Sequence, residues 1–240
     1  MAAAGIVCGL LFVSLRAVKM KLDWENAVYI YTFGFIGAGV GAKILYLLLS
    51  VRDIAQDLKT HGFVDVLIAY SQGGMVFYGG FLGAIAAAFL TAKYLRLDIK
   101  EYYPALVPGI AVLAGFGRIG CFLGGCCYGA VTSSHLAVVF PEGGEAPAGV
   151  PLVPVQLYEA LFDALLFLLL AFVGGKDKIK PHLLKIYMAS YAVFRFILEF
   201  WRGDEVRGIF GPFSTSQWIS LVIIAVVVFI TIKSRRVMVK

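Results

Sequence analysis

Five polar residues recur at helical spacing inside one apolar stretch of the sequence. Tyr187, Tyr191, Arg195 and Glu199 follow one another at intervals of four, and Arg202 comes three positions later. Positions three or four apart share one helical face, so a polar stripe is expected. Charges at membrane depth are costly and usually face a polar cavity. The stripe indicates either a cationic wall that binds an anion, or a self-neutralising Arg195–Glu199 pair with Arg202 reaching the interface.

A second arginine, Arg118, stands among the many glycines between Gly115 and Gly129. Each glycine weakens a helix by up to about 1 kcal/mol relative to alanine, so close approach of a partner helix or a ligand must compensate. A guanidinium with nearby backbone N–H groups suits a phosphate. Small-residue helix packing is the alternative for the glycines, but it does not explain Arg118.

Two other stretches carry polar groups into apolar surroundings. The glycine pairs Gly73-Gly74 and Gly79-Gly80 bracket Tyr78 and predict a broken or re-entrant start of a span. Tyr78 either donates a hydrogen bond there or anchors the interface. Further along, Gln156, Glu159 and Asp163 share one helical face, and the two buried carboxylates are expected to pair with the arginines. The three histidines all fall in predicted loops: His61, His135 and His182.

Cys121, Cys126 and Cys127 lie close together in the sequence. Their spacing fits none of the paired patterns of zinc sites, and no histidine is near, so no metal site is predicted. A disulfide or a reactive thiol is one interpretation, and small apolar packing is the default one.

Composition places these residues in a membrane protein. The 240 residues are 60% apolar and 15% charged, with a mean hydropathy of +0.87, whereas soluble domains are about 45–50% apolar and about 25% charged. The net charge of +6 fits the basic loops of membrane proteins. We therefore expect the membrane as a partner, no nucleic acid and no cofactor.

Hydropathy predicts an all-α, polytopic protein: a single transmembrane domain over residues 1–240 with about seven spans. The first span, at about 14 residues, reaches only about 21 Å of a core about 30 Å thick, so it extends through Val18, tilts in a thinned patch, or is shortened at its N-terminus. The predicted spans are Ala2–Leu15, Ala27–Val51, Gly74–Ala92, Tyr103–Phe122, Val155–Val173, Leu183–Trp201 and Ser216–Ile232.

The distribution of basic residues predicts the orientation. Lys and Arg are concentrated after the first, third and fifth spans and in the C-terminal tail, whereas the opposite loops hold only Arg52, Lys59, Arg202 and Arg207. This bias predicts an outside N-terminus and a cytoplasmic C-terminus. The connection that contains residues 130–153 is then an outer loop, and it serves either as a small head or lid or as a mere connector.

Taken together, these motifs resemble the bacterial prolipoprotein diacylglyceryl transferase family. Tyr191, Arg195 and Glu199 are in register with the family's sixth span, and the similarity runs from about Gly34 to Ser220. The other motifs that carry the resemblance are Gly117-Arg118-Ile119-Gly120 with Tyr128-Gly129, Gly73-Gly74-Met75 with Gly79-Gly80, and the element from Pro154 to Glu159.

The resemblance implies a multi-pass protein of the bacterial inner membrane. Its activity would transfer a diacylglyceryl group from phosphatidylglycerol to the lipobox cysteine of a prolipoprotein, recognised through its signal peptide, and release glycerol phosphate. Arg118 and Arg195 match the family's essential arginines, and we expect Tyr78 and Tyr191 to assist them. The expected substrate-binding residues are Gly117, Gly120, Gly129, Tyr158, Glu159, Glu199 and Arg202.

The sequence also departs from the family pattern. Tyr78 replaces a histidine, Cys121 an asparagine, Cys126 an acidic residue and Lys43 an arginine, and the first-span Trp-Tyr-Gly element is missing. Residues suited to phosphate remain, whereas tyrosine, with a pKa near 10, is a poor base. The alternatives are a divergent paralogue that transfers a lipid or glyceryl group to another acceptor, and a non-enzymatic phospholipid-binding or transport protein.

Overall fold

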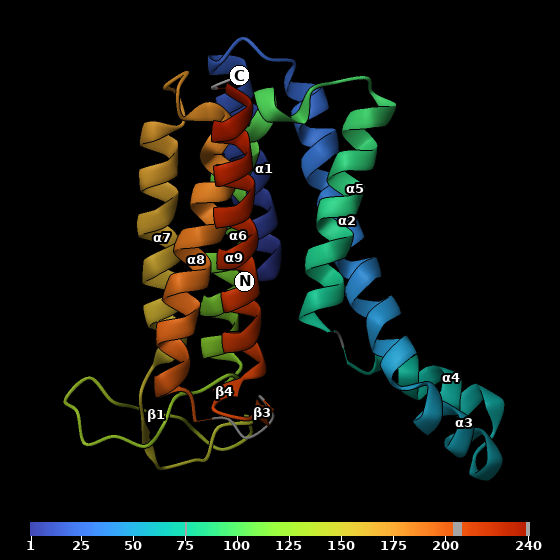
Figure 1. The fold of residues 1–240 in the computed structure, drawn as a ribbon. Helices are drawn as coiled ribbons and strands as arrows, with labels where there is room; N and C mark the ends of the chain where they lie inside the picture. Colours follow the sequence, from blue (N-terminus) through green and yellow to red (C-terminus); the bar gives the residue numbers. More distant parts are fainter. Residues whose placement is uncertain (75, 204–207, 239–240) are drawn as a thin grey trace. The chain divides into compact units, whose positions relative to one another are not determined.

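The computed structural model describes residues 1–74, 76–203 and 208–238, so Met75 and Arg207 lie outside the described residues. Helices dominate this part of the chain, with two short antiparallel strand pairs (Figure 1). The elements are α1 (Ala2–Lys19), α2 (Trp24–Leu49), α3 (Val51–Thr60), α4 (Phe63–Gln72), α5 (Phe77–Tyr94), α6 (Ile99–Leu123), β1 (Val138–Val139), β2 (Pro151–Leu152), α7 (Val155–Val173), η1 (Lys180–His182), α8 (Leu183–Leu198), η2 (Glu199–Trp201), β3 (Ile209–Phe210), β4 (Phe213–Ser214) and α9 (Thr215–Met238).

Each predicted span coincides with a helix, and α7 has the predicted bounds. The first helix continues to Lys19, so its 18 residues reach about 27 Å at 1.5 Å per residue. Five helices of the described part, α1, α2, α6, α7 and α9, are long and apolar enough to cross a membrane. The remaining two, α5 and α8, have 18 and 16 residues. The chain is therefore a multi-pass membrane protein, and the number of seven spans stays a prediction.

The chain divides into two compact units, which are described separately. In the unit of residues 13–102, α2 and α5 pack through glycines. A Cβ at Gly41 would meet the carbonyl of Gly79, and one at Gly83 would meet the carbonyl of Gly37. Small residues allow such close backbone approach between membrane helices. Helix packing thus accounts for Gly79, one of the glycines that suggested a broken start of the third span.

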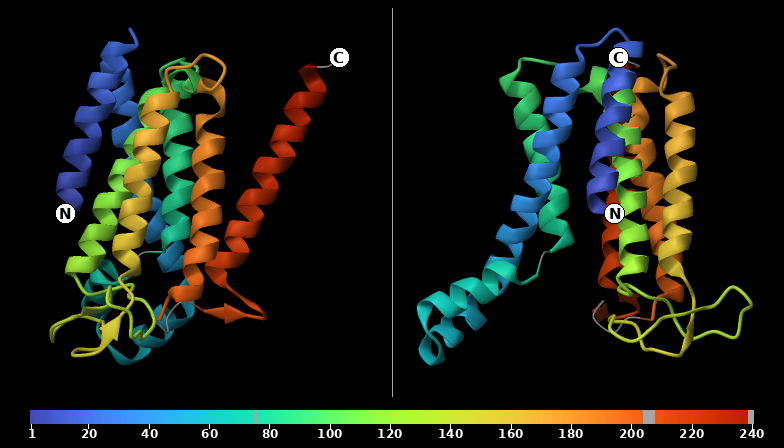
Figure 2. Two further views of the ribbon diagram at one scale, coloured as in Figure 1. Left: turned by 90° about the vertical axis from the view of Figure 1, so that its left-hand side faces the viewer. Right: turned by 180° about the vertical axis from the view of Figure 1, so that it is seen from behind.

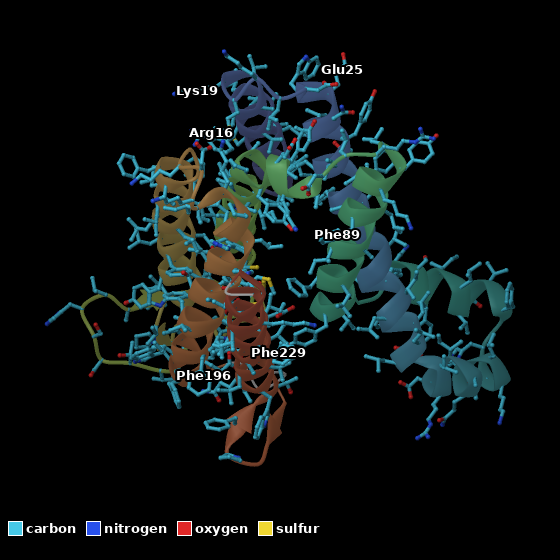
Figure 3. The ribbon with its side chains drawn as sticks, turned by 45° about the horizontal axis from the view of Figure 1, so that its top comes forward. Arg16, Lys19, Glu25, Phe89, Phe196 and Phe229 are labelled. Atoms are coloured by element: carbon cyan, nitrogen blue, oxygen red, sulfur yellow. The ribbon has the colours of Figure 1, made fainter. Side chains whose placement is uncertain are left out.

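In the same unit, the ammonium group of Lys43 is held by backbone carbonyls. Nζ of Lys43 donates hydrogen bonds to the carbonyls of Ser71 and Gly73, at 2.9 and 2.8 Å. These carbonyls lie at the end of α4, where helix C=O groups lack helical partners and favour a cation. At the turn into α2, Arg16 and Lys19 of α1 lie at the same end of the unit as Glu25 (Figure 3).

The other unit contains residues 1–12 and 103–240, with α6, α7 and α8 side by side (Figures 1 and 2). Helix α9 meets α8 near the strand pairs and diverges from it toward the C-terminus. The stacked rings of Phe162 and Phe194, 3.9 Å apart between centroids, join α7 to α8. The first turns of α1 also pack here, because Phe12 contacts Phe167 edge to face.

The segment after α6 forms a small folded region at one end of these helices (Figure 2). Strand β1 pairs with β2, so that Val138 lies opposite Leu152. Phe140, Ala146 and Leu152 form a buried apolar cluster, with Phe122 packed against it. Residues 130–153 thus have a hydrophobic core of their own, which a mere connector would not need. Their position outside the membrane stays a prediction.

Candidate active site

One carboxylate, that of Glu159, joins three of the predicted site residues. It is 2% exposed on α7, and its Oε1 lies 3.0 Å from Nη2 of Arg118 on α6. The hydroxyl of Tyr191 on α8 donates a hydrogen bond of 2.8 Å to the same oxygen. The other oxygen, Oε2, lies 3.6 Å from Nη1 of Arg195. Three helices therefore bring both arginines to a single anion.

Arg195 has a second carboxylate on its own helix face. Its Nη2 lies 3.0 Å from Oε2 of Glu199, four residues on, and donates a longer hydrogen bond of 3.4 Å to Ser216. The predicted pairing of Arg195 with Glu199 is thus present, and the contact with Glu159 is added to it. Nη1 of Arg195 is buried and has no hydrogen-bond partner within the described part of the chain. This nitrogen makes only the 3.6 Å ion pair with Glu159, so it can still donate a hydrogen bond to a bound oxygen.

The carboxyl group of Asp163 stands apart from this network. Asp163 is fully buried on α7, one turn beyond Glu159, yet among the described residues neither of its oxygens accepts a hydrogen bond. The prediction that carboxylates on this face pair with the arginines therefore holds for Glu159 only. Gln156, on the same face, donates a hydrogen bond of 2.8 Å to the carbonyl of Cys126. This bond connects the start of α7 to the turn that follows α6.

Arg202 is held at the rim of this unit by backbone pairing. It is 7% exposed, follows η2, and forms an isolated antiparallel bridge with Gly129. A Cβ at Gly129 would lie 2.7 Å from Cβ of Val153 and 2.9 Å from the carbonyl of Trp201. Close backbone packing therefore explains Gly129, which positions the segment that carries Arg202.

The other expected binding residues have different surroundings. A Cβ at Gly117 would have nothing within 4 Å, so packing does not account for this glycine, whereas one at Gly120 would lie 3.3 Å from Cβ of Met1. Tyr158 is 37% exposed, next to the buried Glu159. Tyr78 belongs to the other compact unit, so its placement next to the arginines stays a prediction.

The end of α6 gathers three thiols, which the sequence spacing did not predict. Gly125 has a φ of +64°, the Cys126 N–H donates to the Cys121 carbonyl at 3.1 Å, and the Gly125 N–H donates to the Phe122 carbonyl at 3.2 Å. These two bonds define a Schellman motif, which typically brings the side chains at the positions of Cys121 and Cys126 together. The glycine after the helix was the signal that sequence reasoning missed.

Cys127 completes this group because its own φ is +58°, a left-handed conformation uncommon for residues other than glycine. The Sγ atoms of Cys121, Cys126 and Cys127 all lie within 4.8 Å of one another. A hydrogen bond from Cys121, together with the positive charges of Arg202 and Arg118, lowers the pKa of the Cys127 thiol from its ordinary value. The three thiols thus border the arginines of the site.

The fold and the site define a multi-pass membrane protein with a buried guanidinium–carboxylate cluster between three helices. A family model described as "Prolipoprotein diacylglyceryl transferase" matches residues 1–233. The chain belongs to this family, which confirms the resemblance found in its motifs.

Curated relatives agree over nearly the whole chain. Phosphatidylglycerol–prolipoprotein diacylglyceryl transferase 2 of Clostridium perfringens (strain 13 / Type A) is 36% identical over 93% of this chain and 85% of that protein. The transferase of Clostridium tetani is 34% identical over 96% of this chain and 89% of its own length. That of Geobacter sulfurreducens is 34% identical over 82% of this chain and 73% of its own.

Proposed function

We propose that this protein transfers the diacylglyceryl group of phosphatidylglycerol to the lipobox cysteine thiol of a prolipoprotein and releases glycerol phosphate. The names of the relatives support this activity. The protein acts in the bacterial inner membrane as a single domain, with seven spans, its N-terminus outside and its C-terminus in the cytoplasm. The prolipoprotein signal peptide is its second substrate.

The convergence of Arg118 and Arg195 on Glu159 is the observation that carries the proposal. Glu159 contacts both guanidiniums, at 3.0 and 3.6 Å, and it orients them toward one region. Nη1 of Arg195 makes this 3.6 Å ion pair but no hydrogen bond in the described part of the chain, so it offers a donor to a phosphate oxygen. Guanidinium groups match phosphate geometry with paired N–H donors.

The charges of this cluster favour an anionic lipid. Arg118 and Arg195 are balanced by Glu159 and Glu199, with which they form ion pairs. Arg202, nearly buried and three residues beyond Glu199, adds a further cation. The phosphodiester of phosphatidylglycerol carries one negative charge, and nearby guanidiniums stabilise such an anion in apolar surroundings.

The reaction gives the arginines a role in the transition state. The thiolate of the acceptor attacks the glyceryl carbon that bears the phosphate, a C–S bond forms, and the C–O bond breaks with its electrons leaving on glycerol phosphate. Negative charge therefore grows on the phosphate, where Arg118 and Arg195 stabilise it. Glu159 and Glu199 position the arginines, and the hydroxyl of Tyr191 donates a hydrogen bond to Glu159. Tyr78 donates a hydrogen bond to the phosphate. Gly117, Gly120 and Tyr158 border the lipid.

Transfer in nanodiscs tests this proposal. Discs containing labelled phosphatidylglycerol are incubated with the protein and a lipobox peptide, and the thioether product is measured by mass spectrometry. We expect product with the native chain and almost none with Arg118→Ala or Arg195→Ala, whereas Arg52→Ala, an exposed arginine of α3, keeps full activity. Headgroup release without thioether would instead favour a different acceptor, and lipid bound unchanged over long incubation would favour a carrier.

A further inference from the structure

Cys121, Cys126 and Cys127 form the one group of potential metal ligands in the described part of the chain whose donor atoms converge. Their Sγ atoms lie within 4.8 Å of one another. All three side chains are partly exposed, so an ion and a further ligand can reach the sulfur atoms. Adjacent side chains usually point apart, and the left-handed Cys127 brings two neighbouring thiols to the same place.

We propose that these three cysteines bind a thiophilic divalent cation, namely Zn²⁺. The fourth coordination position of this ion is then taken by the thiol of the acceptor peptide. The second half of this inference rests on the proposed transferase function. The first half, the metal site, depends only on the thiol cluster.

The donor set and its spacing suit zinc. Thiolates are soft ligands that Zn²⁺ binds at about 2.3 Å in tetrahedral geometry, which places two sulfur atoms about 3.8 Å apart. Atoms already within 4.8 Å reach this arrangement by small side-chain rotations. Three protein ligands and one open position are the pattern of catalytic rather than structural zinc.

The surrounding backbone holds the ligand loop in place. The backbone N–H of Cys126 is bound to the Cys121 carbonyl, and its own carbonyl accepts a hydrogen bond from Gln156, so the loop is fixed on both sides. Three thiolates around Zn²⁺ carry one net negative charge, and a fourth thiolate makes two.

Metal binding would deprotonate the acceptor thiol. The thiol must lose its proton before it attacks carbon, and Glu159 and Glu199 are engaged with guanidiniums. A thiol that coordinates Zn²⁺ is deprotonated, and the proton passes to solvent. Its sulfur lone pair then forms the C–S bond while the C–O electron pair leaves on glycerol phosphate. No oxidant or reductant is required, and Arg118, one turn before Cys121, holds the departing phosphate.

Cobalt titration tests the metal site without any activity measurement. Purified protein in detergent, kept reduced, is titrated with Co²⁺, which reports tetrahedral thiolate coordination by its charge-transfer and d–d absorption. We expect one equivalent to bind and Zn²⁺ to displace it. Each of Cys121→Ser, Cys126→Ser and Cys127→Ser should weaken binding at least tenfold. The matched control Cys8→Ser, on α1 outside the cluster, should bind as the native chain does.

The metal site is overturned if no thiolate–cobalt absorption band appears. It is also overturned if Cys121→Ser, with a native circular dichroism spectrum, binds cobalt as tightly as the native chain. A disulfide between two of the three cysteines in anaerobically purified protein overturns it as well. Replacement by alanine at the same positions checks that serine does not act as a substitute ligand.

The acceptor role is tested by metal removal. Chelator-treated protein should lose thioether formation at least tenfold and regain it with one equivalent of Zn²⁺, while its affinity for phosphatidylglycerol vesicles stays unchanged. Full transfer by metal-free protein overturns the acceptor role and leaves the transferase proposal standing. Conversely, absence of thioether product from the metal-loaded native chain would overturn the transferase proposal, whereas one equivalent of bound cobalt would leave the metal site standing.

Discussion

Arg118 on α6 and Glu159 on α7 lie 3.0 Å apart, and the carboxylate of the pair is 2% exposed. Because an isolated charge inside a membrane is costly, this contact fixes the register of two helices as well as the direction of a guanidinium. The same carboxylate reaches Arg195, so the position of Glu159 decides where both cations point.

Replacement of Arg118 by lysine is expected to lower the transfer rate by about 10²–10³-fold, nearly as much as replacement by alanine. Lysine keeps the charge but lacks the planar fork that donates two parallel hydrogen bonds to a phosphate. Initial rates at saturating phosphatidylglycerol measure the effect, with Arg52→Lys as the control. A fully active Arg118→Lys variant would mean that charge alone suffices.

Glu159→Gln is expected to destabilise the protein, by about 3–5 kcal/mol, because two guanidiniums lose their shared buried counterion. Tyr191→Phe removes only the 2.8 Å hydrogen bond to Glu159, and we expect a loss of about 1 kcal/mol. Ring stacking between Tyr187 and Tyr191 is retained in that variant. Thermal unfolding in detergent gives both values, and equal losses would contradict the central role of the carboxylate.

Gly117→Ala separates lipid binding from packing. A Cβ at this position meets nothing within 4 Å, so the melting temperature should stay the same or rise slightly. The affinity for phosphatidylglycerol should fall, because the lipid approaches the backbone beside Arg118. Gly129→Ala provides the contrast, because its Cβ would press on the carbonyl of Trp201 and lower the melting temperature. Unchanged lipid affinity in Gly117→Ala would remove Gly117 from the binding site.

Asp163→Asn is expected to raise stability by about 1 kcal/mol or more and to leave transfer unchanged. The carboxyl group is fully buried and accepts no hydrogen bond from the described residues, so its desolvation is uncompensated there. Thermal unfolding and the peptide assay are read on the same sample. Lost transfer in a stable variant would instead make Asp163 part of the reaction.

The contact between α2 and α5 can be tested with two neighbouring glycines. Gly41→Ala places a methyl group on the carbonyl of Gly79 and should cost about 1–3 kcal/mol, since the helices must separate. Gly39→Ala, with nothing within 4 Å, should be neutral or stabilise by up to about 1 kcal/mol through helix propensity. Similar melting temperatures for the two variants would contradict close packing here.

The helices could be predicted from the sequence because apolar runs of suitable length have few alternatives in a membrane. The bounds of α7 agree with the hydropathy segment. Helix α1 continues beyond Leu15, which is one of the three interpretations of the short first span. The thiol cluster could not be found in this way. Spacing rules describe paired cysteines, whereas here a Schellman turn and a left-handed residue fold the chain back on itself.

The sequence by itself determined the membrane class, the family motifs and the polar face of α8, since periodicity fixes which residues share a helical face. Only the tertiary structure decided that Arg118 and Arg195 share Glu159 and that Asp163 does not join them. The reason is that the rotation of each helix against its neighbours depends on side-chain packing, such as the stacking of Phe162 on Phe194, which periodicity along one helix does not encode.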